Sequence, residues 1–235
     1  GYMSNDILSK IKGGLIVSCQ ALENEPLHSS YIMQRMAVAA MQGGAVGIRA
    51  NTIEDIVKIK ESVKLPVIGI IKNEYTDCDV YITPTIQEVD KLVQAGVEII
   101  AMDSTKRRRP DKRTLDEFFG EVRTKYPDQM FMADCSDFEE GMHAAEIGFD
   151  IIGTTMRGYT EYTKDVQIPD YNLIEKLVQK CGKPVIAEGG IWTPQQLEKV
   201  MQLGVIAAVV GTAITRPYEI TKRFVKVIQK SEGKK

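Results

Sequence analysis

The stretch that decides the fold spans residues 42–72, which read QGGAVGIRANTIEDIVKIKESVKLPVIGIIK. Two short runs rich in Val, Ile, Ala and Gly, at 45–50 and 66–72, flank a segment whose apolar and charged residues repeat with helical spacing. Runs that are almost continuously apolar are typical of strands buried on both faces of a parallel sheet. The stretch therefore predicts a strand, an amphipathic helix that begins near Thr52, and a second strand parallel to the first.

The same pair of elements recurs from one end of the chain to the other. Expected strands cover residues 14–21, 45–50, 66–72, 99–104, 130–135, 151–155, 184–189 and 207–212. Expected helices cover residues 31–42, 52–62, 85–94, 115–126, 137–147, 171–179, 194–203 and 219–229. Eight such units predict an α/β fold, a single (β/α)8 TIM barrel, and a doubly wound sheet with eight strands is the alternative.

The composition excludes several classes of protein. Lys and Arg number 30 and Asp and Glu 32, so the net charge of 30 − 32 = −2 is too balanced for binding nucleic acid through bulk charge. The apolar runs are far shorter than the roughly 20 residues needed to span a membrane. No linker divides the chain, so residues 1–235 are expected to form one barrel domain, with residues 1–10 and 231–235 as polar ends.

The cysteines and histidines show no pattern of a metal site. Four cysteines lie far apart, at 19, 78, 135 and 181, and the two histidines, His28 and His143, are isolated. Such cysteines are typical of free thiols in a reducing compartment, and the N-terminal residues do not resemble a secretory signal. A cytoplasmic protein is therefore expected.

Ionisable side chains gather at the predicted C-terminal ends of the strands, where the active site of a barrel lies. Arg49, Lys72, Asp103, Asp134 and Glu188 each follow an apolar run at that end. Any one of them would be ordinary as a loop charge. Five together indicate a functional site, because buried charges are costly unless they are paired.

Lys72 and Glu188 belong to the third and seventh predicted strands, which face each other across the mouth of an eight-stranded barrel. The two groups are therefore expected to reach a central substrate from opposite sides. This geometry is typical of a two-base racemase or epimerase, in which one group removes a proton and the other delivers one to the opposite face. Lys72 suits that role if burial and a neighbouring cation such as Arg49 lower its pKa.

A phosphate site is predicted beside this pair, after the seventh and eighth strands. The chain there reads Glu188-Gly189-Gly190-Ile191 and Val210-Gly211-Thr212-Ala213. Glycines let backbone N–H groups come close to an anion, and barrels often bind phosphate with these two loops. Arg216 follows soon after and would add a charge-assisted contact.

Two other features suggest ligand binding less strongly. The basic run KRRR at 106–109 is of the kind that binds nucleic acid, but it is isolated in a near-neutral chain and lies in a predicted strand-to-helix loop. A solvated loop or a second contact to an anion is therefore the preferred interpretation. Trp192 is expected to pack rather than to stack on a ligand.

A series of motifs, in order from about residue 14 to residue 216, extends this interpretation. They are IVSCQA at 16–21, GIRA at 47–50, GIIK at 69–72, YITPT at 81–85, DSTKRRRP at 103–110, ADCS at 133–136, GTTMRGYT at 153–160 and AEGGI at 187–191. In this combination the chain resembles the N-acylglucosamine-6-phosphate 2-epimerase family, also called N-acetylmannosamine-6-phosphate 2-epimerases. Ser104 stands where the family often has alanine.

The resemblance implies interconversion of N-acetylmannosamine 6-phosphate and N-acetylglucosamine 6-phosphate, in sialic-acid and amino-sugar catabolism. It implies Lys72 and Glu188 as the acid/base residues. It places four residues around the sugar and its phosphate: Gln20, Arg49, Asp134 and Arg216. It leaves the roles of Asp103 and Arg157 open.

The resemblance also implies the partners of the chain. They are a phosphorylated N-acetylhexosamine as substrate and a second copy in a homodimer, with no metal or organic cofactor. The interface could be supplied by the last helix or by three side chains of the predicted helix at 171–179: Leu173, Ile174 and Leu177. Burial of these three against the barrel is the simpler explanation.

Two other functions remain open from the sequence. A Schiff-base aldolase or lyase would use Lys72 as a nucleophile on a phosphorylated sugar, although Glu188 opposite Lys72 argues for proton transfer instead. A non-catalytic sugar-phosphate binding protein would not need both members of the pair.

Overall fold

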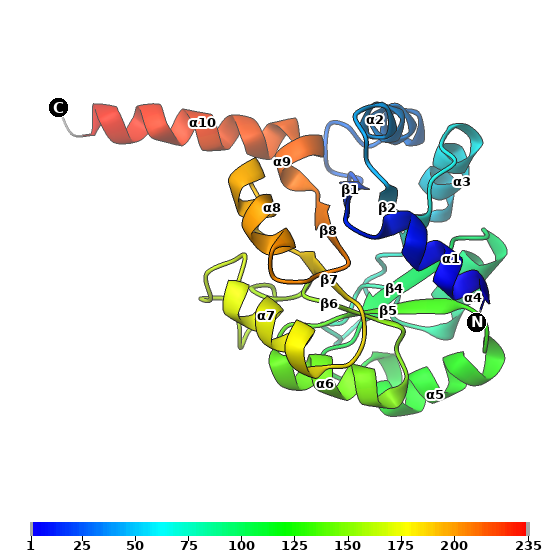
Figure 1. Ribbon diagram of the computed structural model, residues 1–235. Coiled ribbons are helices and arrows are strands. Elements are labelled where there is room, and N and C mark those ends of the chain that lie inside the picture. The colour runs from blue at the N-terminus through cyan, green and yellow to red at the C-terminus, as the bar shows by residue number, and fades with distance from the viewer. Residues whose placement is uncertain (1, 234–235) are drawn as a thin grey trace.

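The computed structural model describes residues 2–233 and shows a closed barrel of parallel strands surrounded by helices (Figure 1). In that range eight strands follow one another in chain order, and β1 (Gly14–Cys19) pairs with β8 (Ala207–Val210) to close the barrel. A doubly wound sheet would instead leave two open edges. Closure therefore confirms the predicted (β/α)8 barrel and excludes the alternative.

The elements alternate as the sequence predicts. The other strands are β2 (Gly47–Asn51), β3 (Val67–Ile70), β4 (Ile99–Asp103), β5 (Met130–Asp134), β6 (Ile151–Gly153) and β7 (Val185–Glu188). The helices between strands are α2 (Ser30–Gln42), α3 (Ile53–Ser62), α4 (Ile86–Gln94), α5 (Leu115–Lys125), α6 (Phe138–Ile147), α7 (Tyr171–Lys180) and α8 (Pro194–Met201). Most strands end slightly earlier than predicted, because the chain leaves the sheet there to form the loops above the barrel.

Local contacts fix where the helices begin and end. Thr85 and Glu88 form a capping box at the start of α4, and Thr193 and Gln196 form another at the start of α8. Gly148 ends α6 with a φ of +108°, a left-handed conformation that suits glycine. The two capping boxes end the loops that follow β3 and β7, on the side of the barrel that carries the site.

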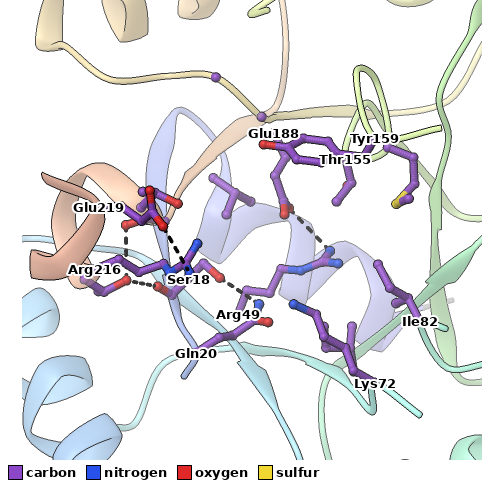
Figure 2. Close-up of a pocket in the computed structure, with 18 of the residues that line it drawn as sticks. Ser18, Gln20, Arg49, Lys72, Ile82, Thr155, Tyr159, Glu188, Arg216 and Glu219 are labelled. Atoms are coloured by element: carbon purple, nitrogen blue, oxygen red, sulfur yellow. Dashed lines mark hydrogen bonds and ion pairs between the residues drawn. The ribbon is translucent and has the colours of Figure 1, made fainter. Parts of the chain in front are cut away.

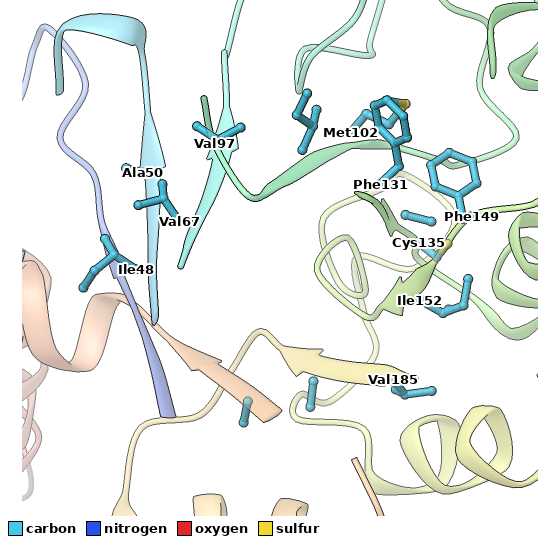
Figure 3. Close-up of a cluster of buried hydrophobic side chains, with 14 of the residues drawn as sticks. Ile48, Ala50, Val67, Val97, Met102, Phe131, Cys135, Phe149, Ile152 and Val185 are labelled. Carbon is cyan, nitrogen blue, oxygen red and sulfur yellow. The ribbon is translucent and has the colours of Figure 1, made fainter. Parts of the chain in front are cut away.

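Two layers of apolar side chains form the core. Inside the barrel lies a cluster that includes Ile16, Ile68, Ile99, Met132, Ile151 and Ile186. A larger cluster fills the space between strands and helices (Figure 3). In it, Phe119 stacks on Phe149 with ring centroids 3.9 Å apart and meets the edge of Phe131 at 5.7 Å. This packing fixes the strands around the barrel axis.

The N-terminal segment differs from the polar end that the sequence predicts for residues 1–10. It forms helix α1 (Tyr2–Ile11), in which Ile11 is buried and Ile7 and Leu8 pack against the cluster inside the barrel. Residues 7, 8 and 11 share one face of a helix, which is why this segment is held against the core. Residues 231 and 232 belong to α10 (Pro217–Glu232), whereas residues 1, 234 and 235 lie outside the described residues.

Helix α10 follows the short helix α9 (Thr212–Thr215) and projects away from the barrel (Figure 1). Phe224, Val227 and Ile228 share one face of α10 and are 73%, 66% and 60% exposed. The three α7 side chains considered for an interface are buried instead: Leu173, Ile174 and Leu177. No helix within residues 2–233 is long and apolar enough to cross a membrane.

The basic run at 106–109 contains a buried structural residue. The Arg109 guanidinium donates to the backbone carbonyls of Thr83 at 2.8 Å, of Pro84 at 3.1 Å, and of Asp103. It also lies 4.1 Å from the centroid of the Phe118 ring. The interpretation as a solvated loop is wrong for Arg109, because its planar guanidinium satisfies three carbonyls beyond the end of the sheet.

Replacement of Arg109 by alanine is expected to lower the free energy of unfolding by about 3 kcal/mol or more, because three carbonyls lose a charged donor. Urea denaturation followed by circular dichroism measures this loss. Arg108→Ala is the matched control, since Arg108 is exposed and its guanidinium donates to the carbonyl of Lys112. Equal losses in the two variants would contradict the structural role of Arg109.

Candidate active site

A cavity of about 460 Å³ opens at the C-terminal ends of the strands. Its walls come from the ends of the strands and the loops that follow them, and from the start of α10 (Figure 2). The predicted site residues that line it are Gln20, Arg49, Lys72, Glu188, Gly189, Gly190, Gly211, Thr212 and Arg216. The barrel thus gathers residues that are far apart in the sequence at one opening.

Asp134 is the predicted site residue that does not line the cavity in the part of the chain that the structure describes. It is buried at the end of β5, where Oδ1 and Oδ2 accept hydrogen bonds from Nη1 and Nη2 of Arg49 at 3.1 and 2.7 Å. The Thr155 hydroxyl donates to Oδ1 of Asp134 at 2.7 Å. Asp134 therefore lies behind Arg49 rather than in the cavity wall, and it fixes the plane of the guanidinium.

The Arg49 guanidinium also contacts Glu188 at the end of β7. Nη1 of Arg49 lies 3.3 Å from Oε1 of Glu188, with the two side chains 1% and 15% exposed. One buried cation is therefore shared between the carboxylates of Glu188 and Asp134. Because burial of charge is costly, this sharing makes the protonation of Glu188 sensitive to its neighbours.

Among the side chains of residues 5–233, three buried polar atoms have no hydrogen-bond partner: Gln20 Oε1, Arg49 Nε and Glu188 Oε1, the last of which is in ion-pair contact with Arg49. All three belong to side chains that line the cavity. Gln20 is held by its Nε2, which donates to Ser18 Oγ at 2.8 Å. Buried polar groups in native proteins nearly always have partners. The cavity therefore suits a polar ligand that supplies both hydrogen-bond donors and acceptors.

Lys72 and Glu188 approach the same part of the cavity. Lys72 lies just beyond β3, where its backbone N–H donates to Asn51 Oδ1 at 2.9 Å and its backbone bridges to Ile82. Figure 2 shows the Lys72 amine and the Glu188 carboxylate on either side of the Arg49 guanidinium. The two side chains thus reach one cavity from opposite strands of the barrel, and both lie near enough to Arg49 for its charge to act on them.

The surroundings shift the pKa values of both groups. Burial raises the pKa of Glu188 to about 7, an effect that the positive charge of Arg49 opposes and the negative charge of Asp134 increases. Burial lowers the pKa of Lys72, and the positive charge of Arg49 adds to this shift. The two pKa values are thereby brought closer together, which suits a pair that gives and takes protons.

Two glycines leave the backbone after β7 without side chains, at the place where phosphate binding is predicted. Gly189 and Gly190 have φ angles of +106° and +78°. A Cβ on Gly190 would lie 2.6 Å from the backbone carbonyl carbon of Ile168, so a side chain does not fit there. Gly211 and Thr212, after β8, line the same cavity. Backbone of this kind lets an anion approach N–H groups closely.

Arg216 also lines the cavity, next to a carboxylate that sequence reasoning missed. Its Nε and Nη2 both donate to Oε1 of Glu25, at 3.0 and 2.7 Å. Glu25 lies in the loop between β1 and α2 and lines the cavity too. No signal in this polar loop distinguishes Glu25, whose side chain turns inward, from its neighbour Glu23, which is exposed.

Aromatic side chains were also missed as part of the site. Tyr81, Tyr159 and Trp192 line the cavity. Tyr81 and Tyr159 belong to the motifs at 81–85 and 153–160, and those motifs could have identified them as site residues. The Arg223 guanidinium lies 4.1 Å from the ring centroid of Trp192, and Trp192 also forms part of the cavity wall, so its expected packing role stays a prediction.

Asp103 and Arg157, whose roles the sequence leaves open, do not line the cavity as far as the chain is described. Asp103 is buried and accepts hydrogen bonds from Thr105 and from the Arg107 guanidinium. Arg157 pairs with Asp170 at 3.0 Å. Both side chains therefore hold loops around the site.

The metal-binding residue types are scattered. Within residues 2–233, no three His, Cys, Asp or Glu side chains are grouped as ligands of a metal ion would be. The cysteines of this range, Cys19, Cys78, Cys135 and Cys181, are free thiols, and three of them are buried.

Comparison with known proteins shows a consistent set of relatives. A model of the family described as "Putative N-acetylmannosamine-6-phosphate epimerase" matches residues 33–230. A protein of Caldanaerobacter subterraneus subsp. tengcongensis is 55% identical over 97% of this chain and 96% of its own length. One of Listeria monocytogenes is 51% identical over 97% of each chain. Both carry the name "Putative N-acetylmannosamine-6-phosphate 2-epimerase".

Solved structures of other proteins are similar to this chain as well. The N-acetylmannosamine-6-phosphate 2-epimerase of Clostridium perfringens matches with a TM-score of 0.89 and 51% identity, over 94% of this chain and 96% of that one. A thiamine phosphate pyrophosphorylase of Pyrococcus furiosus matches with a TM-score of 0.63 and 16% identity, over 92% of this chain and 93% of that one. The second likeness concerns the fold alone.

The raised pKa of Glu188 predicts how stability depends on pH. A carboxyl group whose pKa is higher in the folded protein than in the unfolded chain favours folding at low pH, and this contribution is lost as the pH rises through the folded value of about 7. From about pH 5 to pH 8, the free energy of unfolding of the wild type should therefore fall relative to that of Glu188→Gln. Urea denaturation of both proteins across this range measures the difference, and a difference that stays constant would contradict the shift.

Proposed function

The chain belongs to the N-acetylmannosamine-6-phosphate epimerase family, and we propose that it is an isomerase that interconverts N-acetylmannosamine 6-phosphate and N-acetylglucosamine 6-phosphate. The observation that carries the proposal is the meeting of Lys72 and Glu188 on either side of Arg49 in one cavity (Figure 2). A sugar-phosphate epimerase of this kind would serve sialic-acid and amino-sugar catabolism.

The reaction requires proton transfer at a carbon atom. The two sugars differ in configuration at C2, whose hydrogen is not acidic in the closed ring. In the open chain, the C1 aldehyde accepts the electron pair of the C2–H bond as the proton leaves, which forms an enolate. A proton delivered to the other face of C2 restores the aldehyde with inverted configuration. The site must therefore supply a base, an acid on the opposite side, and a cation near the C1 oxygen.

Lys72 and Glu188 fit the roles of base and acid. In one direction, a neutral Lys72 amine takes the C2 proton and a protonated Glu188 delivers one to the opposite face. This leaves an ammonium and a carboxylate, the protonation state that the reverse reaction needs. The lowered pKa of Lys72 and the raised pKa of Glu188 support this exchange, since each shift favours the neutral form.

Arg49 fits the role of the cation. Its side chain is 1% exposed and its Nε has no partner among the described residues. A donor fixed in a buried site stabilises an enolate oxygen more strongly than water would. We assign Asp134 a positioning role, because it holds the Arg49 guanidinium from behind. Gln20 Oε1 would accept a hydrogen bond from the sugar.

The phosphate group is proposed to lie at the bare backbone beyond β7 and β8. Gly189, Gly190, Gly211 and Thr212 line this side of the cavity and offer backbone N–H groups. Arg216 would add a charged contact. Anchoring the phosphate here would hold C2, at the other end of the open chain, between Lys72 and Glu188.

We further propose a cytoplasmic homodimer. Free cysteines are typical of reducing compartments, which supports the cytoplasm. The exposed apolar face of α10, formed by Phe224, Val227 and Ile228, supports an interface with a second copy, because isolated chains rarely expose a contiguous apolar stripe of this kind.

Lys72→Met and Glu188→Gln are each expected to lower kcat for epimerisation by at least about a hundredfold, because each removes one of the two proton-transfer groups. Proton NMR of N-acetylmannosamine 6-phosphate with each variant measures the rate. Lys64→Met, at an exposed position before β3, is the control and should keep the wild-type rate. A Lys72 variant with wild-type kcat would contradict the assignment, and a borohydride-trapped adduct at Lys72 would favour a Schiff-base enzyme instead.

The dimer proposal predicts that charge on the apolar face of α10 separates the subunits. The double variant Phe224→Glu with Val227→Glu should sediment as a single 26.2 kDa chain, whereas the wild type should sediment at twice that mass. Lys226→Glu changes the charge of the same helix without touching the apolar face, and it should remain dimeric. A monomeric wild type would contradict the proposal.

A further inference from the structure

The Glu25–Arg216 ion pair lies in the wall of the cavity and joins two segments that are far apart in the sequence. Both hydrogen bonds of the pair come from the Nε–Nη2 edge of the guanidinium and go to Oε1 of Glu25. The other carboxylate nearby, Glu219, lies 4.0 Å from Nη2. This edge carries two parallel N–H groups and is one of the two guanidinium edges that can bind a phosphate in bidentate fashion. Glu25 therefore occupies a contact that a phosphate group could use.

Glu25 is held there by few contacts besides Arg216. Its Oε2 accepts a hydrogen bond from the backbone N–H of Leu22 at 2.6 Å, and its backbone N–H closes a turn on the Leu22 carbonyl at 2.9 Å. Leu22 is 44% exposed, and the intervening residues 23 and 24 are exposed as well. The Glu25 side chain itself is 21% exposed, so the mobile part of this turn is its outer end, residues 22–24.

The charge of Glu25 matters beyond Arg216. The negative charge of Glu25 raises the pKa of Lys72 and so acts against burial and the nearby cations, which lower it. Glu25 thus compensates the charges of Arg216 and Lys72. A bound phosphate would bring negative charge to the same place, and two anions on one guanidinium edge would repel each other.

We propose that Glu25 competes with the phosphate of the substrate for Arg216: it occupies the Nε–Nη2 edge of the guanidinium, gives it up when the phosphate binds, and so sets the affinity of the site for phosphate. The inference rests on the proposed function, because it takes the phosphorylated sugar as the ligand. A phosphate group compensates the cation that Glu25 releases. A sugar without phosphate cannot do so, and displacing Glu25 would then leave Arg216 unpaired.

The test measures binding of inorganic phosphate by titration calorimetry at constant ionic strength. Glu25→Gln keeps the shape of the side chain but removes the competing charge. It should bind phosphate more tightly by a factor of roughly two to ten, as expected for loss of a partly exposed ion pair. Glu23→Gln removes the same charge from the same loop without contact to Arg216, and its phosphate affinity should match the wild type.

A double-variant cycle shows whether the effect acts through Arg216. Arg216→Gln should weaken phosphate binding, and adding Glu25→Gln to it should change nothing further. Neutral N-acetylmannosamine should bind wild type and Glu25→Gln equally. Glu25→Ala repeats the test without an amide, and thermal unfolding shows that each variant is folded.

Unchanged or weaker phosphate binding in both Glu25 variants would overturn the proposal, because Glu25 would then support Arg216 rather than compete for it. An equal gain in phosphate affinity in Glu23→Gln would also overturn the proposal, since the effect would then come from the lower net charge of the protein and not from the contact with Arg216. Turnover by the wild type is measured separately. An inactive wild type with the expected phosphate affinities would contradict the proposed function while leaving the competition intact.

Discussion

The buried ion pair between Arg49 and Asp134 is the contact on which the rest of the site depends. It joins β2 to β5 behind the cavity through two hydrogen bonds of 3.1 and 2.7 Å. A pair with side chains 1% and 0% exposed is costly to form and more costly to break, so it fixes the guanidinium in one orientation. Burial is the main cause of the pKa shifts of Glu188 and Lys72, and the charge of Arg49 modifies both: it opposes the rise for Glu188 and adds to the fall for Lys72. The pKa values of the two groups therefore depend on a contact that need not touch the substrate.

The barrel makes this arrangement possible, and most of the barrel could be predicted from the sequence. The short apolar runs are long enough only for strands, and their repetition with helices leaves few other folds. Once the fold is predicted, the C-terminal ends of the strands can be located in the sequence, and the active site of a barrel is expected there. That is why Arg49, Lys72 and Glu188 could be picked out without a structure, and why the cavity contains them. The glycines beyond β7 and β8 could be picked out for the same reason.

What the sequence could not supply was the direction in which each side chain points. Asp134, like Arg49, lies near the C-terminal end of its strand. Its carboxylate nevertheless lies behind the guanidinium instead of lining the cavity. Arg109 belongs to a basic run of the kind usually found on the protein surface. It is buried all the same, because its guanidinium donates hydrogen bonds to backbone carbonyls in the interior. Glu25 lies in a loop without periodicity, and its inward turn depends on Arg216, which lies close only after the barrel closes. Each of these outcomes depends on a partner that is distant in sequence.

In the proposed mechanism, one group removes the hydrogen at C2 and another delivers a new one to the opposite face. The most direct test of this mechanism is proton NMR of one turnover of N-acetylmannosamine 6-phosphate in deuterated water. Because the group that delivers the new hydrogen is not the one that removed the old, the N-acetylglucosamine 6-phosphate formed should carry deuterium at C2. Glu188→Gln should still exchange the C2 hydrogen of one epimer without converting it, since Lys72 remains. Product that retains the original C2 hydrogen would contradict the two-base account.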